Sequence, residues 1–131
     1  MIDTPVQRLI EHAIDSPLKL QLLLLFAENR HLEGTEFQIA QRTFRDIWST
    51  RAALGELADD GILARTQVGE PVYHYRPRPD LLDAIMRLYQ SYNEPLERDA
   101  IQQCVRDTAI FAVHRRAGTQ TYEYGASATV S

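Results

Sequence analysis

The chain has 131 residues, of which 44% are hydrophobic and 24% are charged, and this composition is typical of one globular domain. It excludes disorder of the whole chain, while a net charge of −4 gives no overall basic excess for nucleic acid or anionic membranes, although one face can still be basic. The single cysteine, Cys104, excludes an internal disulfide and a zinc site built from cysteines.

The N-terminal region lacks the features of an export signal or a membrane anchor. Acidic residues interrupt its apolar residues, and no basic segment precedes them. The longest apolar run, residues 22–27, is too short to cross a bilayer. The sequence therefore predicts a cytoplasmic protein that has no membrane partner.

Two helices are predicted at the start of the chain. Thr4-Pro5 and Ser16-Pro17 each place an N-capping side chain before a proline, which favours a helix start at both points. Apolar residues at helical spacing follow the first start. Residues 18–26, which follow the second, are apolar on nearly every side, so we expect this helix to be central.

A second pair of helices is predicted next. Thr35 and Gln38 form a capping-box pattern that starts a third helix. After a break at residues 45–47, an amphipathic fourth helix follows. It is expected to end at Gly61, because glycine suits the position that closes a helix.

A β-hairpin follows the fourth helix. Residues 62–68 and 71–76 have the pattern of two strands, and Gly69 lies in the turn between them. In the second strand Tyr73 and Tyr75 share one face, because side chains alternate along a strand. A two-stranded hairpin is not stable alone, so it is expected to pack against the helices.

Two more helices and a tail complete the predicted order. Apolar periodicity indicates a helix over residues 81–92 and, after Pro95, a last helix over residues 96–114. Residues 115–131 are rich in small and polar residues and are expected to be a flexible tail. The sequence thus predicts one mostly helical domain over residues 1–114, and a single hairpin excludes sheet-based enzyme folds.

The second helix pair and the hairpin resemble the winged helix-turn-helix of ArsR/MarR-type bacterial transcriptional regulators. The resemblance rests on an ordered combination: a polar-capped helix, a tight turn, a helix with a leucine pair, a glycine before two aliphatic residues, and a hairpin. These features fall at residues 35–45, 47–51, 54–57, 60–63 and 72–75. The resemblance implies a winged-helix core at about residues 17–78. It also implies a homodimer, formed by the flanking N- and C-terminal helices, that binds double-stranded DNA.

In such a fold the second helix of the motif, at about residues 48–60, enters the major groove, and the hairpin, at about residues 62–76, follows the DNA backbone. The outward side chains of that helix are the candidate base contacts, and Arg51 has the donor pair that suits guanine. These helix contacts are Trp48, Ser49 and Arg51. The preceding helix and turn supply Thr35, Arg42 and Arg45. The hairpin and the residues after it supply Arg65, Gln67, His74, Arg76 and Arg78.

The charge balance keeps a second function open. Between residues 40 and 80, six arginines are matched by six acidic residues, and Glu70 near the hairpin tip would repel phosphate. Trp48 is unusual on a DNA-reading face and is equally consistent with half-buried packing. The alternative is therefore a winged-helix module that binds another protein and does not bind DNA.

No enzyme activity, cofactor or metal site is predicted. The histidines are scattered, and the sequence contains neither a phosphate-binding loop nor a nucleophile motif. Cys104 is expected to be a buried structural residue rather than a redox sensor. The stripe formed by Met86, Tyr89 and Tyr92 is expected on a core or dimer face, with a ligand pocket as the alternative. The sequence leaves a small-molecule effector open and does not identify one.

Overall fold

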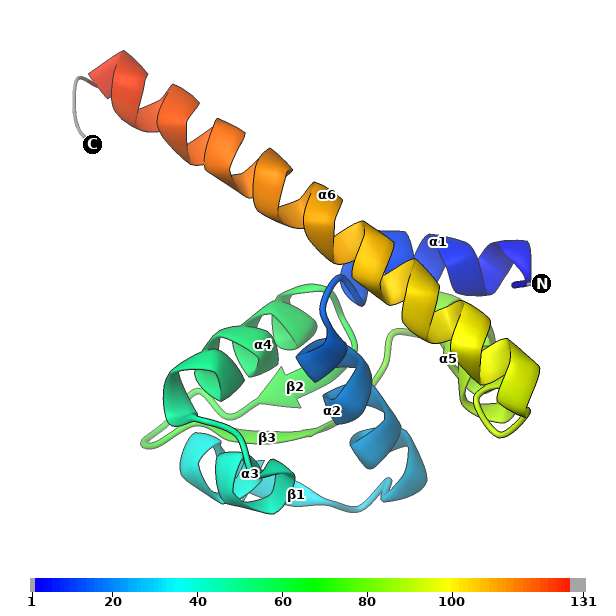
Figure 1. Cartoon of the computed structure of the whole chain (residues 1–131). Coiled ribbons are helices and arrows are strands. Elements are labelled where there is room, and N and C mark those ends of the chain that lie inside the picture. Colours follow the sequence, from blue (N-terminus) through cyan, green and yellow to red (C-terminus); the bar gives the residue numbers. More distant parts are fainter. Residues whose placement is uncertain (1, 128–131) are drawn as a thin grey trace.

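The computed structural model describes the backbone of residues 2–127 and the side chains of residues 2–111 (Figure 1). The helices are α1 (Thr4–Ala13), α2 (Pro17–Glu28), α3 (Glu36–Thr43), α4 (Ile47–Asp59), α5 (Pro79–Ser91) and α6 (Pro95–Ser127). The strands are β1 (Glu33–Thr35), β2 (Leu63–Arg65) and β3 (Val72–Tyr75). The protein is therefore mostly helical with a small sheet, as the sequence predicts.

The sheet has three antiparallel strands in the order β1-β3-β2. Tyr73 of β3 lies opposite Gly34 of β1 and Arg65 of β2, so the hairpin gains a third strand. The sequence predicts the hairpin, with longer strands, but not β1. A strand of three residues is too short to show side-chain alternation, and its partner lies far along the chain.

The core lies around α2, as the sequence predicts. Leu22 and Phe26 of α2 are fully buried, and α2 packs against α4, α5, α6 and β3. Helix α1 packs against α5 and α6. The buried side of α4 joins the same core through Leu54, so α4 is held on one side and exposed on the other.

Local capping explains where α2 and α3 begin. The Ser16 hydroxyl accepts a hydrogen bond from the backbone of Lys19 at the start of α2. The predicted capping box at Thr35 is confirmed, because Thr35 and Gln38 each bond the other's backbone N–H. The predicted cap at Thr4 is wrong by one residue, since Asp3 occupies that position without a side-chain cap.

Helix α6 is longer than the sequence predicts. It continues to Ser127, through most of the segment expected to be a flexible tail, and the rest of that segment lies outside the described residues. The sequence contains no proline after Pro95, so nothing of that kind interrupts the helix. Figure 1 shows α6 crossing over α2 beside α1 and then extending away from the other elements. None of the helices in the described part is both long and apolar enough to cross a membrane.

Candidate nucleic-acid interface

The turn between α3 and α4 is tight and is closed by hydrogen bonds. Phe44, the residue directly after α3, lies in the left-handed region, at φ 58° and ψ 40°. The N–H of Arg45 donates to the carbonyl of Ala40 at 3.0 Å, which satisfies a carbonyl at the helix end. Asp46 caps α4 by accepting a hydrogen bond from the Ser49 N–H at 2.8 Å, and this bond lowers the pKa of the Asp46 carboxyl.

Helix α4 presents a polar and aromatic face to solvent along its first half. Ser49, Arg51 and Ala52 are exposed there, while Leu54 is fully buried on the opposite side. The sequence predicts this division, and the structure confirms it. Trp48 is 71% exposed, which excludes the alternative that it packs half-buried within the domain.

Two neighbours hold the side chain of Arg51 in place. Its Nε donates to Oε1 of Glu36 at 2.7 Å, and its guanidinium carbon lies 5.2 Å from the ring centre of Trp48. The Tyr73 hydroxyl donates to the other oxygen of Glu36 at 3.4 Å. Within the described part of the chain, no residue bonds the two terminal nitrogens of Arg51. Those nitrogens are the pair that bidentate recognition uses.

The predicted DNA contacts on α3 and in the turn differ in the hydrogen bonds that they already form within the chain. Thr35 caps α3 and is half-buried, so its hydroxyl already has a structural role. Arg45 donates from Nε to Oε1 of Gln21 at 3.2 Å. Arg42 is exposed and has no hydrogen bond or ion pair to another described residue. Arg42 and Arg45 thus flank the turn that leads into the exposed half of α4.

The tip of the hairpin carries little positive charge. Gln67 is exposed there beside Val68, which is 88% exposed, and Glu70 follows. His74 lies in the central strand, is half-buried and is opposite Ala64. Between residues 66 and 71 there is no arginine or lysine. Contacts from this tip to a phosphate backbone would therefore have to come from amide groups rather than cations.

Arg65 lies at the exposed end of β2 and is already paired. The Tyr73 hydroxyl and the Asp59 carboxylate raise the pKa of its guanidinium above the ordinary arginine value. The Nη2 of Arg65 lies 3.4 Å from Oδ1 of Asp59 at the end of α4. The pair is exposed on both sides, so solvent screens it.

Arg76 and Arg78 lie at the base of the hairpin, beside the C-terminal end of α4. The N–H of Arg76 bonds the carbonyl of Ile62, and the side chain of Arg78 lies directly over Gly61. Arg78 binds both carboxylate oxygens of Asp80 at 3.2 Å. Because the 13 residues of α4 extend about 20 Å, these two arginines are separated from Arg42 and Arg45 by most of a helix length.

The acidic partners of these arginines are not identified by the sequence. Glu36, Asp59 and Asp80 each pair with a predicted contact residue. Asp80 is only two residues from Arg78, so spacing could have suggested that pair. Glu36 is 15 residues from Arg51, and no local pattern signals an interaction over that separation.

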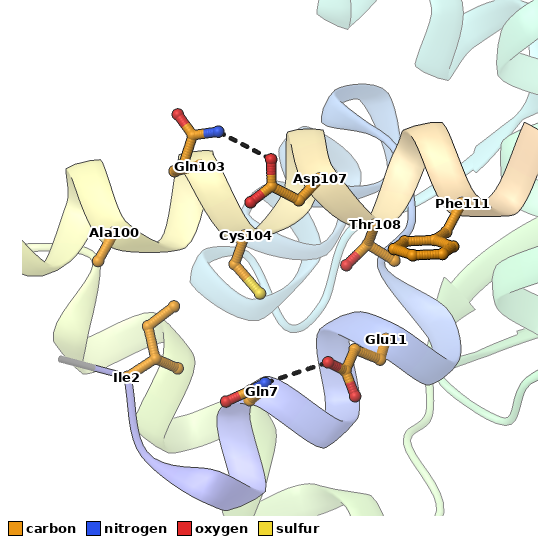
Figure 2. Close-up of a pocket in the computed structure, with 9 residues that line it drawn as sticks. All are labelled: Ile2, Gln7, Glu11, Ala100, Gln103, Cys104, Asp107, Thr108 and Phe111. Carbon is orange, nitrogen blue, oxygen red and sulfur yellow. Dashed lines mark hydrogen bonds between the residues drawn. The ribbon is translucent and has the colours of Figure 1, made fainter.

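A cavity elsewhere in the domain is not part of this surface. It measures about 630 Å³ and lies between α1 and α6, away from α3 and α4 (Figure 2). Figure 2 shows the Cys104 thiol pointing from α6 toward α1, and burial raises the pKa of this thiol. The sequence predicts a buried Cys104, whereas the structure leaves it half-buried because it borders this cavity. Gln7 and Gln103 donate hydrogen bonds to the two carboxylates that line the cavity.

No protein-family model, curated protein or solved structure matches this chain. Within residues 2–111 no group of three or more His, Cys, Asp or Glu side chains is arranged to hold a metal ion. A function for the chain therefore has to be inferred from the geometry of the described residues.

Proposed function

We propose that the chain is a DNA-binding transcriptional regulator of the winged helix-turn-helix kind that acts as a homodimer. The observation that carries the proposal is the environment of Arg51. This arginine lies on the exposed first half of α4, is oriented by Glu36 and Trp48, and keeps its terminal nitrogens available. A side chain ordered before binding loses less entropy when it pairs with a base.

The elements around Arg51 support the same proposal. Helices α3 and α4 meet across a capped turn, and the hairpin formed by β2 and β3 follows α4, in the order that the winged-helix resemblance implies. Arg42 and Arg45 lie beside the entry to α4, where they would bind phosphates on either side of the groove. Arg76 and Arg78 at the base of the hairpin would contact the backbone further along.

Salt-dependent binding tests this function. We expect wild-type protein to bind a labelled mixed-sequence duplex in fluorescence anisotropy, with an affinity that falls steeply as salt rises. The double variant Arg42→Ala/Arg45→Ala should weaken binding. It should also make the dependence of log affinity on log salt shallower by about 0.9 for each phosphate that the variant no longer binds.

A matched control separates local contacts from overall charge. The variant Arg8→Ala/Arg87→Ala removes the same charge from exposed positions on α1 and α5 and should leave the salt dependence unchanged. Equal losses in both double variants would mean that only net charge matters. Absence of binding at low salt, where even non-specific contacts hold, would contradict the proposal.

A second candidate is a module that binds another protein through the same surface. Three exposed aromatic side chains on α3, the turn and α4 favour it: Phe37 at 58%, Phe44 at 94% and Trp48 at 71% exposure. The carboxylate of Glu36 beside Arg51 also lowers the attraction of this face for phosphate. Failure to bind DNA at low salt would favour this candidate, and Trp48→Ala would then be the first variant to test against partners.

A further inference from the structure

Exposed aromatic rings gather on α3, the turn that follows it and the first turn of α4. Phe37, Phe44 and Trp48, which together form the aromatic surface, are each more than half exposed. Among the described residues only one further Phe, Tyr or Trp side chain is exposed, Phe111 on α6. Figure 1 shows α3 on the side of the domain away from α6, so a dimer formed through α6 leaves the aromatic surface free.

Arginines alternate with these rings along the chain. Residues 37–52 contain Arg42, Arg45 and Arg51 but a single acidic residue, Asp46, although the chain as a whole has a net charge of −4. The Asp46 carboxylate already accepts a backbone hydrogen bond as the cap of α4. The aromatic surface therefore lies within a segment that is locally positive.

Two flat groups of this segment already lie against each other. The guanidinium carbon of Arg51 is 5.2 Å from the ring centre of Trp48, and the Nε of Arg51 donates to Glu36. Aromatic rings and guanidinium planes are the groups on which proteins stack the bases of single-stranded nucleic acids. Every base has a flat face, so stacking of this kind does not depend on the hydrogen-bonding edge of the base.

A fully paired duplex offers little to these rings. In its major groove a protein meets the edges of the bases, and a phenylalanine ring has no donor or acceptor with which to bind them. The flat faces of paired bases are covered by the neighbouring base pairs. The rings of the aromatic surface can therefore stack only on bases that are unpaired and turned out of the helix.

We propose that the aromatic surface binds DNA whose bases are unpaired, as in a locally opened duplex. The bases stack on Phe44 and Trp48, and Arg42 and Arg45 bind the phosphates of the same strand. This inference deepens the proposed function and rests on its claim that this face binds DNA.

The arrangement of the surface favours a DNA strand over a protein partner. The core of a protein interface is an apolar area from which charged residues are depleted. Here the aliphatic residues between the rings, Ile39 and Ala40, are buried inside the domain, and exposed arginines separate Phe44 from its neighbours. A nucleic-acid strand presents flat apolar bases and anionic phosphates in the same alternation.

Fluorescence anisotropy with three labelled DNAs tests the preference. The first is a fully paired duplex, the second is the same duplex with a central block of unpaired thymines in both strands, and the third is a single strand of thymines. We expect the opened duplex to bind about tenfold more tightly than the paired duplex, because stacking adds contacts to the bases.

Intrinsic fluorescence reports the contact directly, because Trp48 is the only tryptophan of the chain. Stacking of a base on its ring should quench the emission. The thymine strand should therefore quench it, and the paired duplex should quench it less when each is present at saturation.

Variants that keep or remove a ring separate stacking from other apolar contacts. Trp48→Leu should weaken binding of the opened duplex about tenfold or more, while Trp48→Phe, which keeps a flat ring, should stay within about threefold of wild type. Phe44→Ala should also weaken binding. Leu96→Ala, which removes an 84% exposed side chain at the start of α6, should not. Circular dichroism checks that each variant remains folded.

Salt dependence distinguishes the rings from the arginines. Trp48→Leu should lower the affinity for the opened duplex at every salt concentration and leave the slope of log affinity on log salt unchanged, because a ring binds no phosphate. Arg42→Ala/Arg45→Ala should make that slope shallower.

The outcomes separate this inference from the proposed function. Equal affinity for the paired and the opened duplex, or an equal loss in Trp48→Leu and Trp48→Phe, overturns the inference and leaves the proposed function standing. Binding of the opened duplex alone at low salt supports the inference and contradicts binding of a paired site. Tighter binding of a uracil RNA strand than of the thymine strand overturns the assignment to DNA. Absence of binding to all three DNAs at low salt overturns both proposals.

Discussion

At the scale of single residues, Phe44 occupies a backbone conformation that bulky side chains rarely adopt. Its φ of 58° lies in the left-handed region, where a Cβ atom approaches the following carbonyl oxygen. The Phe44 side chain is 94% exposed, so packing within the chain does not offset this cost. The conformation of Phe44 therefore costs stability that no contact of its ring within the described part of the chain offsets.

Replacing Phe44 with glycine should therefore stabilise the protein. We expect Phe44→Gly to raise the free energy of unfolding by about 0.5–1 kcal/mol, because glycine adopts this conformation without the steric cost. Urea denaturation followed by circular dichroism measures the change. Phe44→Ala keeps the strained backbone and should be close to neutral. A loss of stability in the glycine variant would show that the exposed ring contributes to folding.

For Arg51 the sequence predicts the position of the side chain but not its partner. Its outward position on α4 follows from helical spacing, and the sequence predicts it. Its pairing with Glu36 is not predictable in this way, because that contact depends on how α3 and α4 cross. For Trp48 the sequence likewise leaves two alternatives, a contact on the surface and half-buried packing. Only the packing of α4 shows that the ring is exposed.

At the scale of elements, a buried ion cluster joins α2 to α4. The ammonium of Lys19 lies 2.7 Å from Oδ1 of Asp15, and both side chains are only 4% exposed. The same ammonium pairs with Glu56 of α4. A buried charge is costly unless an opposite charge lies beside it. This cluster therefore fixes the position of α4 relative to α2.

Removing the cation should be strongly destabilising. We expect Lys19→Met to lower the free energy of unfolding by about 3–5 kcal/mol, because Asp15 would lose its ammonium partner while buried. Urea denaturation measures the effect, with Arg8→Met on the exposed side of α1 as control. The double variant Asp15→Asn/Lys19→Met should recover part of the loss. A cost no larger than that of Arg8→Met would contradict this role of the cluster.

Helix starts and strand pairing differ in how far the sequence determines them. Ser16 and Thr35 each cap a helix by accepting a hydrogen bond from the backbone N–H three residues later. A pattern over so short a distance is visible in the sequence. Strand β1 exists because Gly34 pairs with Tyr73, and such pairing leaves no local signal. The hairpin is predictable because its turn and both strands are adjacent in the chain.

At the scale of the whole molecule, exposed apolar side chains on α6 support the proposed homodimer. Ile110 is 62% exposed and Phe111 is 73% exposed, and both belong to α6, which extends away from the other elements (Figure 1). Large apolar side chains that remain exposed in one chain are commonly covered by a second copy. A symmetric pair would also present two copies of α4 to one duplex.

Oligomeric state checks this arrangement directly. We expect light scattering after size exclusion to give the mass of a dimer for wild type and of a monomer for Ile110→Glu/Phe111→Glu, because charge at a buried interface is unfavourable. Val68→Glu, which places a charge on an exposed apolar position of the hairpin, should remain dimeric. A monomeric wild type would rule out the dimer.

The sequence by itself determined the order of the helices, the hairpin and the outward face of α4. These features rest on caps, turns and periodicity, which act between residues a few positions apart. Only the tertiary structure decided the third strand and the partner of Arg51. Each of these joins segments far apart in the chain, and their meeting depends on how the whole core packs.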